Sequence, residues 1–378
     1  MRAVRPVAHD PLSGLVAVAT YDAVRAVEVD PVRFSSAGGS RPGTGPMPFM
    51  IDMDDPSHKD RRRLVSSGFT PRRVRAHEVG VRDLCDALID RVCQKGHCDL
   101  VADLAAPLPL IVIGELLGVA PSDRDDLLRW SDAMVASQTA LAGEEASAVA
   151  DAATGAFVEY HAYASAVIAD RRNSPTGDLV STLVHAEVDG EKLTDDEIVY
   201  ETLLILVGGD ETTRHVIAGG IEELCRHRDQ VRRLAEDPSA VRAAVEEMLR
   251  WTSPVKTMAR TVTGDTELCG TALRAGDELV LLYESANFDD AHFAEPDRFD
   301  SGRWPNDHLA FGLGTHHCLG ASLARLEVAT MTERILARLP DLTPRDDAPA
   351  PLRPNSFASG PMTVEVRFTP TEPVGATT

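Results

Sequence analysis

The sequence predicts one mainly α-helical domain, spanning residues 1–378, with a small β region. Apolar residues recur at three-and-four spacing over most of the chain, which is typical of helices, and the segments with strand-like character are short. No internal repeat or interdomain linker is visible in the sequence. A chain of 378 residues that is 43% hydrophobic is long enough to bury a large core.

Helical spacing predicts helices over residues 21–29, 71–93, 121–138, 147–172, 195–226, 239–251 and 319–339. Strand-like segments lie at 15–20, 257–262, 266–269, 278–282 and 362–368. Glycine and proline cluster at 38–48, which indicates a mobile loop, and we expect residues 370–378 to form a disordered tail. The apolar run 108–120 contains Pro109 and Glu115, so it indicates a buried helix rather than a membrane span.

Composition narrows the function classes. The net charge of −21 argues against general nucleic-acid binding and favours a soluble protein. No apolar stretch is long enough for stable membrane insertion, and no signal peptide is visible. Six cysteines in a chain of this length are too few for a disulfide framework and indicate a reducing compartment. We therefore expect a cytoplasmic protein.

Cys318 lies in the most informative segment, residues 311–320, which read FGLGTHHCLG. The glycines permit a tight loop, and the cysteine arrives where the next predicted helix begins. Free N–H groups and the helix dipole would stabilise a thiolate there. A single buried thiolate, with His316 two residues before it, suits one axial bond to a haem iron. The alternative is a buried structural cysteine at a helix start.

On this motif the chain resembles the cytochrome P450 superfamily of haem-thiolate monooxygenases, and the resemblance covers nearly the whole chain. It implies a triangular, mainly α fold, haem b (iron-protoporphyrin IX) as cofactor, Cys318 as the iron ligand, and Phe311 and Gly320 beside the cofactor. Family members carry further residues before the first helix-and-strand unit. We therefore expect that roughly one helix is missing at the start, or that the protein does without it.

The predicted helix at 195–226 carries the second motif. Thr194 and Glu197 form a capping box, so the helix begins firmly. Gly208 and Gly209 interrupt its middle at a cost of about 2 kcal/mol relative to alanine, which often marks a functional site. Glu211 and Thr212 follow. Splitting O2 requires protons, which Thr212 could donate and Glu211 could relay from solvent. The alternative is a surface helix with a capping threonine.

Haem propionates need cations and donors. His58 and Arg62 lie four residues apart on one helical face, Arg260 lies in a strand-like segment, and His316 precedes Cys318 by two residues. The resemblance implies that these four contact the propionates, although each taken alone could be a solvated surface charge. It also implies a structural role for Glu247 and Arg250. With a third residue, Arg303, they would hold the core of the protein together.

The candidate substrate pocket is apolar, which favours a bulky lipid-like molecule; its residues are Phe49, Met50, Ile51, Leu203, Val207, Val255, Met258 and Phe357. Residues 50–56, 208–215 and 251–256 are similar to those of actinobacterial steroid side-chain hydroxylases. That resemblance implies oxidation of the terminal (C-26/27) methyl of cholesterol or cholest-4-en-3-one, with the 38–48 loop admitting a large ligand end-first. The alternatives are a biosynthetic hydroxylase of a macrolide or terpene, and a haem-based gas sensor or carrier.

Monooxygenation with O2 needs two electrons, and the sequence has no flavin or nicotinamide motif. A separate redox partner is therefore expected, namely a ferredoxin served by an NAD(P)H-dependent reductase. A cluster of arginines would dock it in spite of the acidic overall charge; its members are Arg61, Arg62, Arg63, Arg72, Arg73 and Arg75.

Overall fold

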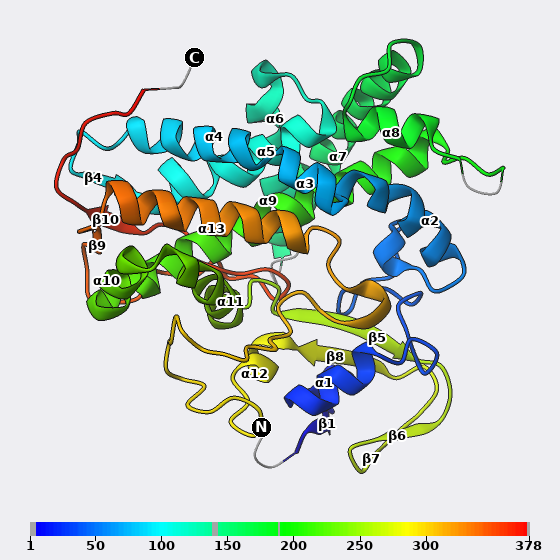
Figure 1. The fold of residues 1–378 in the computed structure, drawn as a ribbon. Coiled ribbons are helices and arrows are strands. Elements are labelled where there is room, and N and C mark those ends of the chain that lie inside the picture. The colour runs from blue at the N-terminus through cyan, green and yellow to red at the C-terminus, as the bar shows by residue number, and fades with distance from the viewer. Residues whose placement is uncertain (1–4, 138–142, 188–189, 376–378) are drawn as a thin grey trace.

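The computed structural model describes residues 5–137, 143–187 and 190–375, and helices fill most of it (Figure 1). The helices are α1 (Tyr21–Glu28), α2 (Ser57–Ser66), α3 (Pro71–Ala76), α4 (Glu78–Asp90), α5 (Pro107–Leu117), α6 (Arg124–Ala136), α7 (Gly143–Asn173), α8 (Leu179–His185), α9 (Asp195–Arg226), α10 (Arg228–Glu236), α11 (Val241–Thr252), α12 (Tyr283–Asn287) and α13 (Ala321–Arg338). The predicted fold class, mainly α with a small β region, is confirmed. One domain over 1–378 stays a prediction.

The strands form two small sheets and a hairpin. The larger sheet has the order β1 (Val7–His9), β2 (Val16–Val18), β8 (Glu278–Leu282), β5 (Thr257–Val262) and β3 (Phe34–Ser35). Only the β2–β8 pair in that sheet is parallel. A second sheet orders β4 (His97–Asp99), β10 (Glu365–Arg367) and β9 (Thr343–Pro344), and β6 (Thr266–Leu268) pairs with β7 (Thr271–Leu273). Figure 1 shows the larger sheet with α1 and α12 below the main body of helices.

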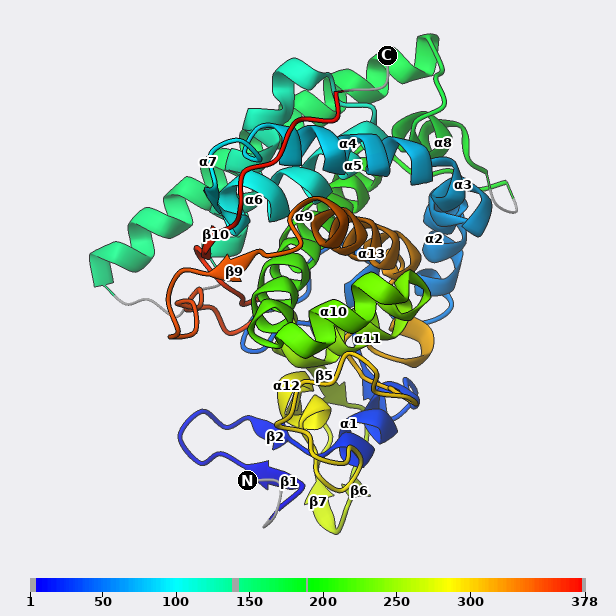
Figure 2. The same ribbon diagram turned by 60° about the vertical axis from the view of Figure 1, so that its left-hand side comes forward.

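Helix α9 runs through the middle of the helical region and packs against α5, α7, α11 and α13 (Figure 2). It begins with the expected capping box, in which the Thr194 hydroxyl accepts from Glu197 N at 3.2 Å and the Glu197 carboxylate accepts from Thr194 N at 2.8 Å. Its first half, up to Leu206, packs with α5–α8, and its second half, from Val216, packs with α4, α11 and α13. The glycine pair at 208–209 therefore lies between two separate apolar clusters.

The differences from the predicted elements have local causes. The pattern at 71–93 is two helices, α3 and α4, that meet at His77. Val74 and Val81 lie on either side of the break and enter the same core cluster, so the apolar spacing does not reveal it. The short helices α8, α10 and α12 were not predicted, and strand 362–368 shrinks to β10. None of the helices within the described ranges combines the length and the hydrophobicity that a membrane span needs.

The expectation of a disordered tail needs correction for residues 370–375. Thr371 N donates to Cys93 O at 2.9 Å, and the amides of Val374 and Gly375 donate to the Asp90 carboxylate, each at 3.1 Å. These bonds tie the segment to the end of α4, which the polar composition of the tail does not indicate. Residues 376–378 lie outside the described residues.

Glu247 and Arg250 form the expected pair on α11, and both side chains are fully buried. Arg250 Nε and an Nη donate to the two Glu247 carboxylate oxygens at 2.8 and 2.9 Å. Glu247 also accepts from Arg303 Nε at 3.0 Å and from the amide of Asp300 at 2.9 Å. Since five donor atoms from four residues satisfy its charge, with Asn306 Nδ2 at 3.0 Å among them, Glu247 holds residues 300–306 against α11.

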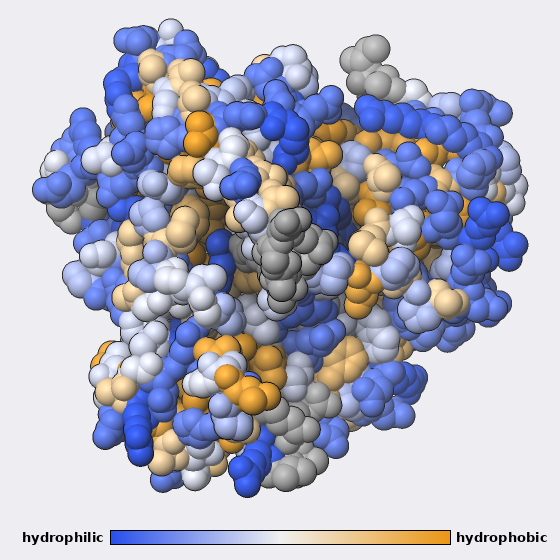
Figure 3. Space-filling model, turned by 180° about the vertical axis from the view of Figure 1, so that it is seen from behind, coloured by the Kyte–Doolittle hydropathy of each residue, from blue (hydrophilic) through white to orange (hydrophobic). Residues whose placement is uncertain are grey.

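The outer surface contrasts with this interior. The face seen in Figure 3 is predominantly hydrophilic, with apolar residues in smaller patches between charged and polar ones. This distribution agrees with the large net negative charge of the sequence.

Candidate active site

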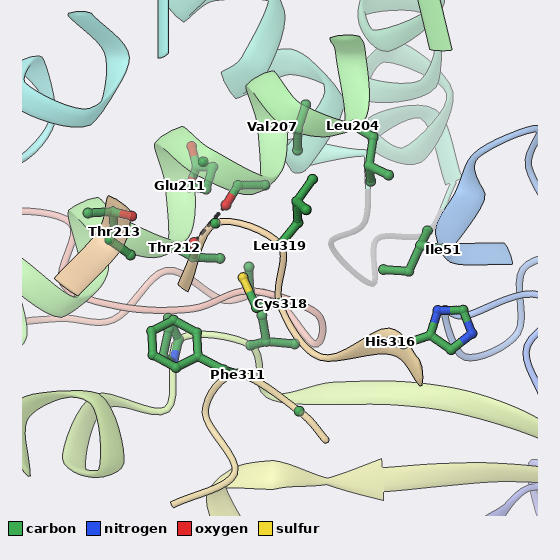
Figure 4. Close-up of a pocket in the computed structure, with 18 of the residues that line it drawn as sticks. Ile51, Leu204, Val207, Glu211, Thr212, Thr213, Phe311, His316, Cys318 and Leu319 are labelled. Carbon is green, nitrogen blue, oxygen red and sulfur yellow. Dashed lines mark hydrogen bonds between the residues drawn. The ribbon is translucent and has the colours of Figure 1, made fainter. Parts of the chain in front are cut away.

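A large cavity lies between α9, the loop that precedes α13, and strand β5 (Figure 4). It encloses about 1660 Å³ of empty space, part of it open to solvent. Residues far apart in the chain, with His58, Thr212 and Cys318 among them, line this one cavity.

The loop 311–320 places the Cys318 sulfur so that it points toward α9 (Figure 4). Gly312 and Gly314 have φ angles of +61° and +65°, which glycine adopts without strain. The loop closes where Cys318 N donates to Phe311 O at 2.8 Å. Arg325 on α13 covers the Phe311 ring, 4.5 Å from its centroid, and is held by two hydrogen bonds to Glu246.

The thiol of Cys318 has accessible surface, but that surface faces the cavity deep inside the fold. Burial raises the pKa of Cys318, and the backbone amides of Gly320 and Ala321 together with Arg62 and Arg325 act in the opposite direction. A thiolate at this position thus has donors and positive charge around it but little water. A bound metal ion would supply the remaining stabilisation.

Glu28, at the end of α1, connects this loop to the rest of the cavity wall, and sequence reasoning missed it. One carboxylate oxygen accepts from the Leu313 amide at 2.8 Å, and the other accepts from the Tyr283 hydroxyl at 2.7 Å and from Arg260 at 3.0 Å. Only 5% of Glu28 is exposed. A Cβ at Gly312 would lie 2.9 Å from the same carboxylate, so this glycine is required by close approach as well as by its φ angle.

On the α9 side, Gly208 opens the helix backbone to the cavity, and a Cβ there would meet nothing within 4 Å. Gly209 packs closely on Ile113, whose nearest atom would lie 3.0 Å from an added Cβ. The Thr212 hydroxyl donates to Gly208 O at 2.7 Å, shown as the dashed line in Figure 4. Thr212 and Cys318 therefore face each other across the cavity.

The Glu211 side chain is 1% exposed and takes part in an ion-pair cluster. It contacts Arg214, one turn along α9, and lies 3.5 Å from an Nη of Arg353. Both arginines also reach an Asp132 carboxylate oxygen at 3.3 Å, and the Asp132 side chain is 43% exposed. A continuous charged chain therefore runs from the cavity wall to the surface.

All four candidate propionate ligands line the same cavity. The His58 and His316 rings lie 4.2 Å apart, and Arg62 donates to the carbonyls of Thr315, at 3.1 Å, and His317. The buried His316 Nε2 has no hydrogen-bond partner among the described residues. Burial, Arg260, His58 and Arg62 lower the pKa of His316 to about 3. An anionic group placed here would satisfy the orphaned nitrogen and the cations, so these residues fit haem propionates.

The apolar lining is mostly as expected, since Met50, Ile51, Val207, Val255, Met258 and Phe357 border the cavity. Two expectations need correction. Leu203 points into the helical core instead, and Leu204 lines the cavity in its place. Phe49 is buried behind the wall, against Tyr200. Residues 208 and 204 lie four and eight positions before Thr212, and residue 207 lies four before residue 211, so helical spacing places them on one face. This spacing identifies Leu204 as a lining residue.

The single sulfur of Cys318 faces the helix that carries Glu211 and Thr212, and the cations of the candidate propionate site lie on one side. This arrangement matches a haem that is held through one thiolate and two propionates. The fold and the site thus define a haem-thiolate protein. The chain belongs to the cytochrome P450 family, whose model matches residues 147–368. It is a monooxygenase that uses protoporphyrin IX haem.

Individual known proteins are similar over almost the entire chain. Identity is 56% over 376 residues to the steroid C26-monooxygenase of Mycobacterium tuberculosis strain CDC 1551, covering 99% of this chain and 100% of that protein. It is 54% to the steroid C26-monooxygenase of Mycolicibacterium smegmatis, covering 99% and 92%. The structure of CYP109E1 from Bacillus megaterium in complex with testosterone superposes with a TM-score of 0.89 at 32% identity, covering 97% and 96%.

Replacing Glu28 by Gln is expected to destabilise the protein, because Arg260 would lose its carboxylate while remaining buried. Breaking a buried ion pair costs about 3–5 kcal/mol. Tyr283→Phe is the matched control, since it removes one hydrogen bond to the same carboxylate without removing a charge, and it should cost about 1.5–3 kcal/mol. Denaturant unfolding measures both. Equal losses of unfolding free energy in the two variants would show that the ion pair between Glu28 and Arg260 contributes no more than the hydrogen bond from Tyr283.

Proposed function

We propose that this monooxygenase hydroxylates the terminal side-chain methyl of a sterol such as cholesterol or cholest-4-en-3-one. The observation that carries the proposal is the 56% identity, over 99% of the chain, to a steroid C26-monooxygenase. The cavity supports it, because its lining beyond the Cys318 loop is apolar and comes from α9, β5 and the segment around Phe357. An apolar side chain can be desolvated there at little cost.

Bound haem would supply the activation of O2, and the Cys318 thiolate would hold its iron and donate electron density to it. The residues of this chain have three tasks. The apolar lining, with Leu204, Val207 and Val255 among its members, orients the C–H bond and excludes water. Thr212 presents to the cavity a hydroxyl that donates to the carbonyl of Gly208, one turn earlier in the continuous helix. Glu211 exchanges protons with solvent through water beside its ion pairs, which lead toward Asp132 at the surface; Arg214 and Arg353 hold the carboxylate but keep their own protons.

We further propose that a ferredoxin, reduced by an NAD(P)H-dependent reductase, delivers the electrons, and that the protein works in the cytoplasm with its cysteines reduced. The candidate arginine cluster is smaller than the sequence indicated. Arg61 pairs with Glu197 and Glu201 beside α9, Arg62 faces the cavity, and Arg73 donates to Thr182 at 3.3 Å. Arg63, Arg72 and Arg75 are exposed, and Arg63 lies 3.6 Å from Asp60. Arg72 and Arg75 lie on α3, which packs on α13 beyond Cys318.

The substrate is tested by titrating the purified ferric protein with cholest-4-en-3-one and following the haem Soret band. The expected result is a shift to high-spin haem at micromolar ligand, followed by product hydroxylated at the side-chain terminus. A macrolide and a terpene of similar size are the comparison ligands. If they shift the spectrum and no sterol does, the protein is a biosynthetic hydroxylase. If no organic ligand is turned over although O2 binds, a gas sensor or carrier is the better description.

Thr212→Ala is expected to uncouple oxygen consumption from product formation, because the cavity loses the hydroxyl that passes protons. Peroxide should then account for most of the electrons consumed, with a loss of product of about 10²-fold. Thr212→Ser keeps the hydroxyl and should restore most of the coupling. The ratio of product to O2 consumed is the measurement. Coupling that stays normal in the alanine variant would contradict the assigned route.

Charge reversal at Arg72 and Arg75 together is expected to slow reduction by ferredoxin at low salt, by about tenfold, and the difference should shrink as salt rises. Arg274→Glu is the control, because it makes the same change of sign at an exposed position next to β7, far from α3. Stopped-flow reduction under carbon monoxide gives the rates. Equal rates in both variants would mean that α3 is only a solvated face.

A further inference from the structure

Arg41 is a cation in the cavity wall that no acceptor within the described residues satisfies. Its guanidinium makes no hydrogen bond or ion pair with any residue in the described part of the chain, although it lies among cavity-lining residues. It is flanked instead by two aromatic rings, with its central carbon 5.2 Å from the Phe357 centroid and 5.8 Å from the Phe49 centroid. Rings of this kind attract a cation but leave its five N–H donors without acceptors.

The other two arginines of the cavity differ from Arg41 in this respect. Arg62 donates to two backbone carbonyls, and Arg260 donates to the Glu28 carboxylate at 3.0 Å and to Ala259 O at 2.7 Å. Burial lowers the pKa of Arg41, and Asp52 opposes that shift only from beyond ion-pair distance. The Asp52 carboxylate is already occupied by the amides of Ser40 and Met47, at 2.9 and 2.8 Å.

The backbone fixes Arg41 at a junction of three segments. The carbonyl of the preceding residue, Ser40, accepts from Ala259 N on β5 at 2.8 Å. Phe357 O accepts from Lys256 N at 2.7 Å, so the ring that contacts Arg41 is tied to the approach to the same strand. The ring contact between His58 and His316 belongs to a group that also includes Arg260 and Arg62. Arg41 is not among the charges that lower the pKa of His316, although its backbone neighbour is bonded to the same strand as Arg260.

We propose that Arg41 donates a hydrogen bond to the oxygen on the ring system of the steroid, at the end opposite the methyl that is oxidised. The inference rests on the proposed sterol substrate and adds the residue that recognises its polar end. A keto or hydroxyl oxygen supplies the acceptor that Arg41 lacks, and the apolar ring system packs against Phe357, which lines the cavity. A single polar anchor on an otherwise apolar ligand fixes how far its other end reaches toward Cys318.

The test compares cholest-4-en-3-one with cholest-4-ene, which has the same carbon skeleton without the oxygen, on the haem-loaded protein. Dissociation constants come from the Soret shift and independently from equilibrium dialysis. The native protein is expected to bind the ketone at least about tenfold more tightly, as a hydrogen bond to a charged donor implies. In Arg41→Met the preference should fall below about twofold, with affinity for the hydrocarbon retained. Arg41→Lys keeps a positive donor and should keep most of the preference.

Two results would overturn the inference while the sterol substrate stands. One is a ketone preference that Arg41→Met leaves unchanged. The other is loss of haem from Arg41→Met, because Arg41 would then serve the propionates with Arg62 and Arg260. A native protein that binds neither ligand would instead overturn the sterol substrate itself, and with it the role of Arg41. The distribution of hydroxylated products is a second readout, since loss of the anchor should spread oxidation to neighbouring side-chain carbons.

Discussion

The whole site depends on how the chain holds one sulfur atom, that of Cys318, at the start of α13 and facing α9. The loop that carries it packs Phe311, Leu313 and Leu319 against three apolar clusters, and buried polar bonds also fix it from several directions. Glu28 holds the Leu313 amide, and Asn287 Oδ1 holds the Leu309 amide at 2.7 Å. Asn287 O in turn accepts from Arg250 at 2.8 Å, so the Glu247 cluster extends to the same loop. Elements far apart in sequence therefore stabilise one atomic position together.

The sequence predicts best those features whose partners are close in the chain. The capping box of α9, the Glu247–Arg250 pair and the loop around Cys318 are all local patterns, and each is found in the structure. Glu28 could not be found in this way, because its three partners lie 232, 255 and 285 residues away. The chain contains many acidic residues, and nothing local distinguishes this one. Burial against distant donors defines its role.

The cavity lining shows the same limit at finer scale. Leu203 and Leu204 are chemically identical, and only the rotation of α9 decides which of them faces the cavity. That rotation could have been inferred from Thr212, because Leu204 and Thr212 lie on one face of α9, two turns apart. Arg41 gave no such signal, because it lies in a glycine- and proline-rich loop whose path depends on hydrogen bonds to β5. The C-terminal segment 370–375 is likewise held in place by a distant partner, Asp90.

The cavity carries a basic wall although the protein as a whole has a net charge of −21. That wall comes from α2, β5 and the Cys318 loop, and its members are His58, Arg62, Arg260 and His316. Burial raises the pKa of Asp210 on α9 to about 6, and burial with Asp210 raises the pKa of Glu327 on α13 well above its ordinary value. Haem propionates would find their positive partners on the basic wall, whereas Arg41 lies between two aromatic rings and has a different set of neighbours.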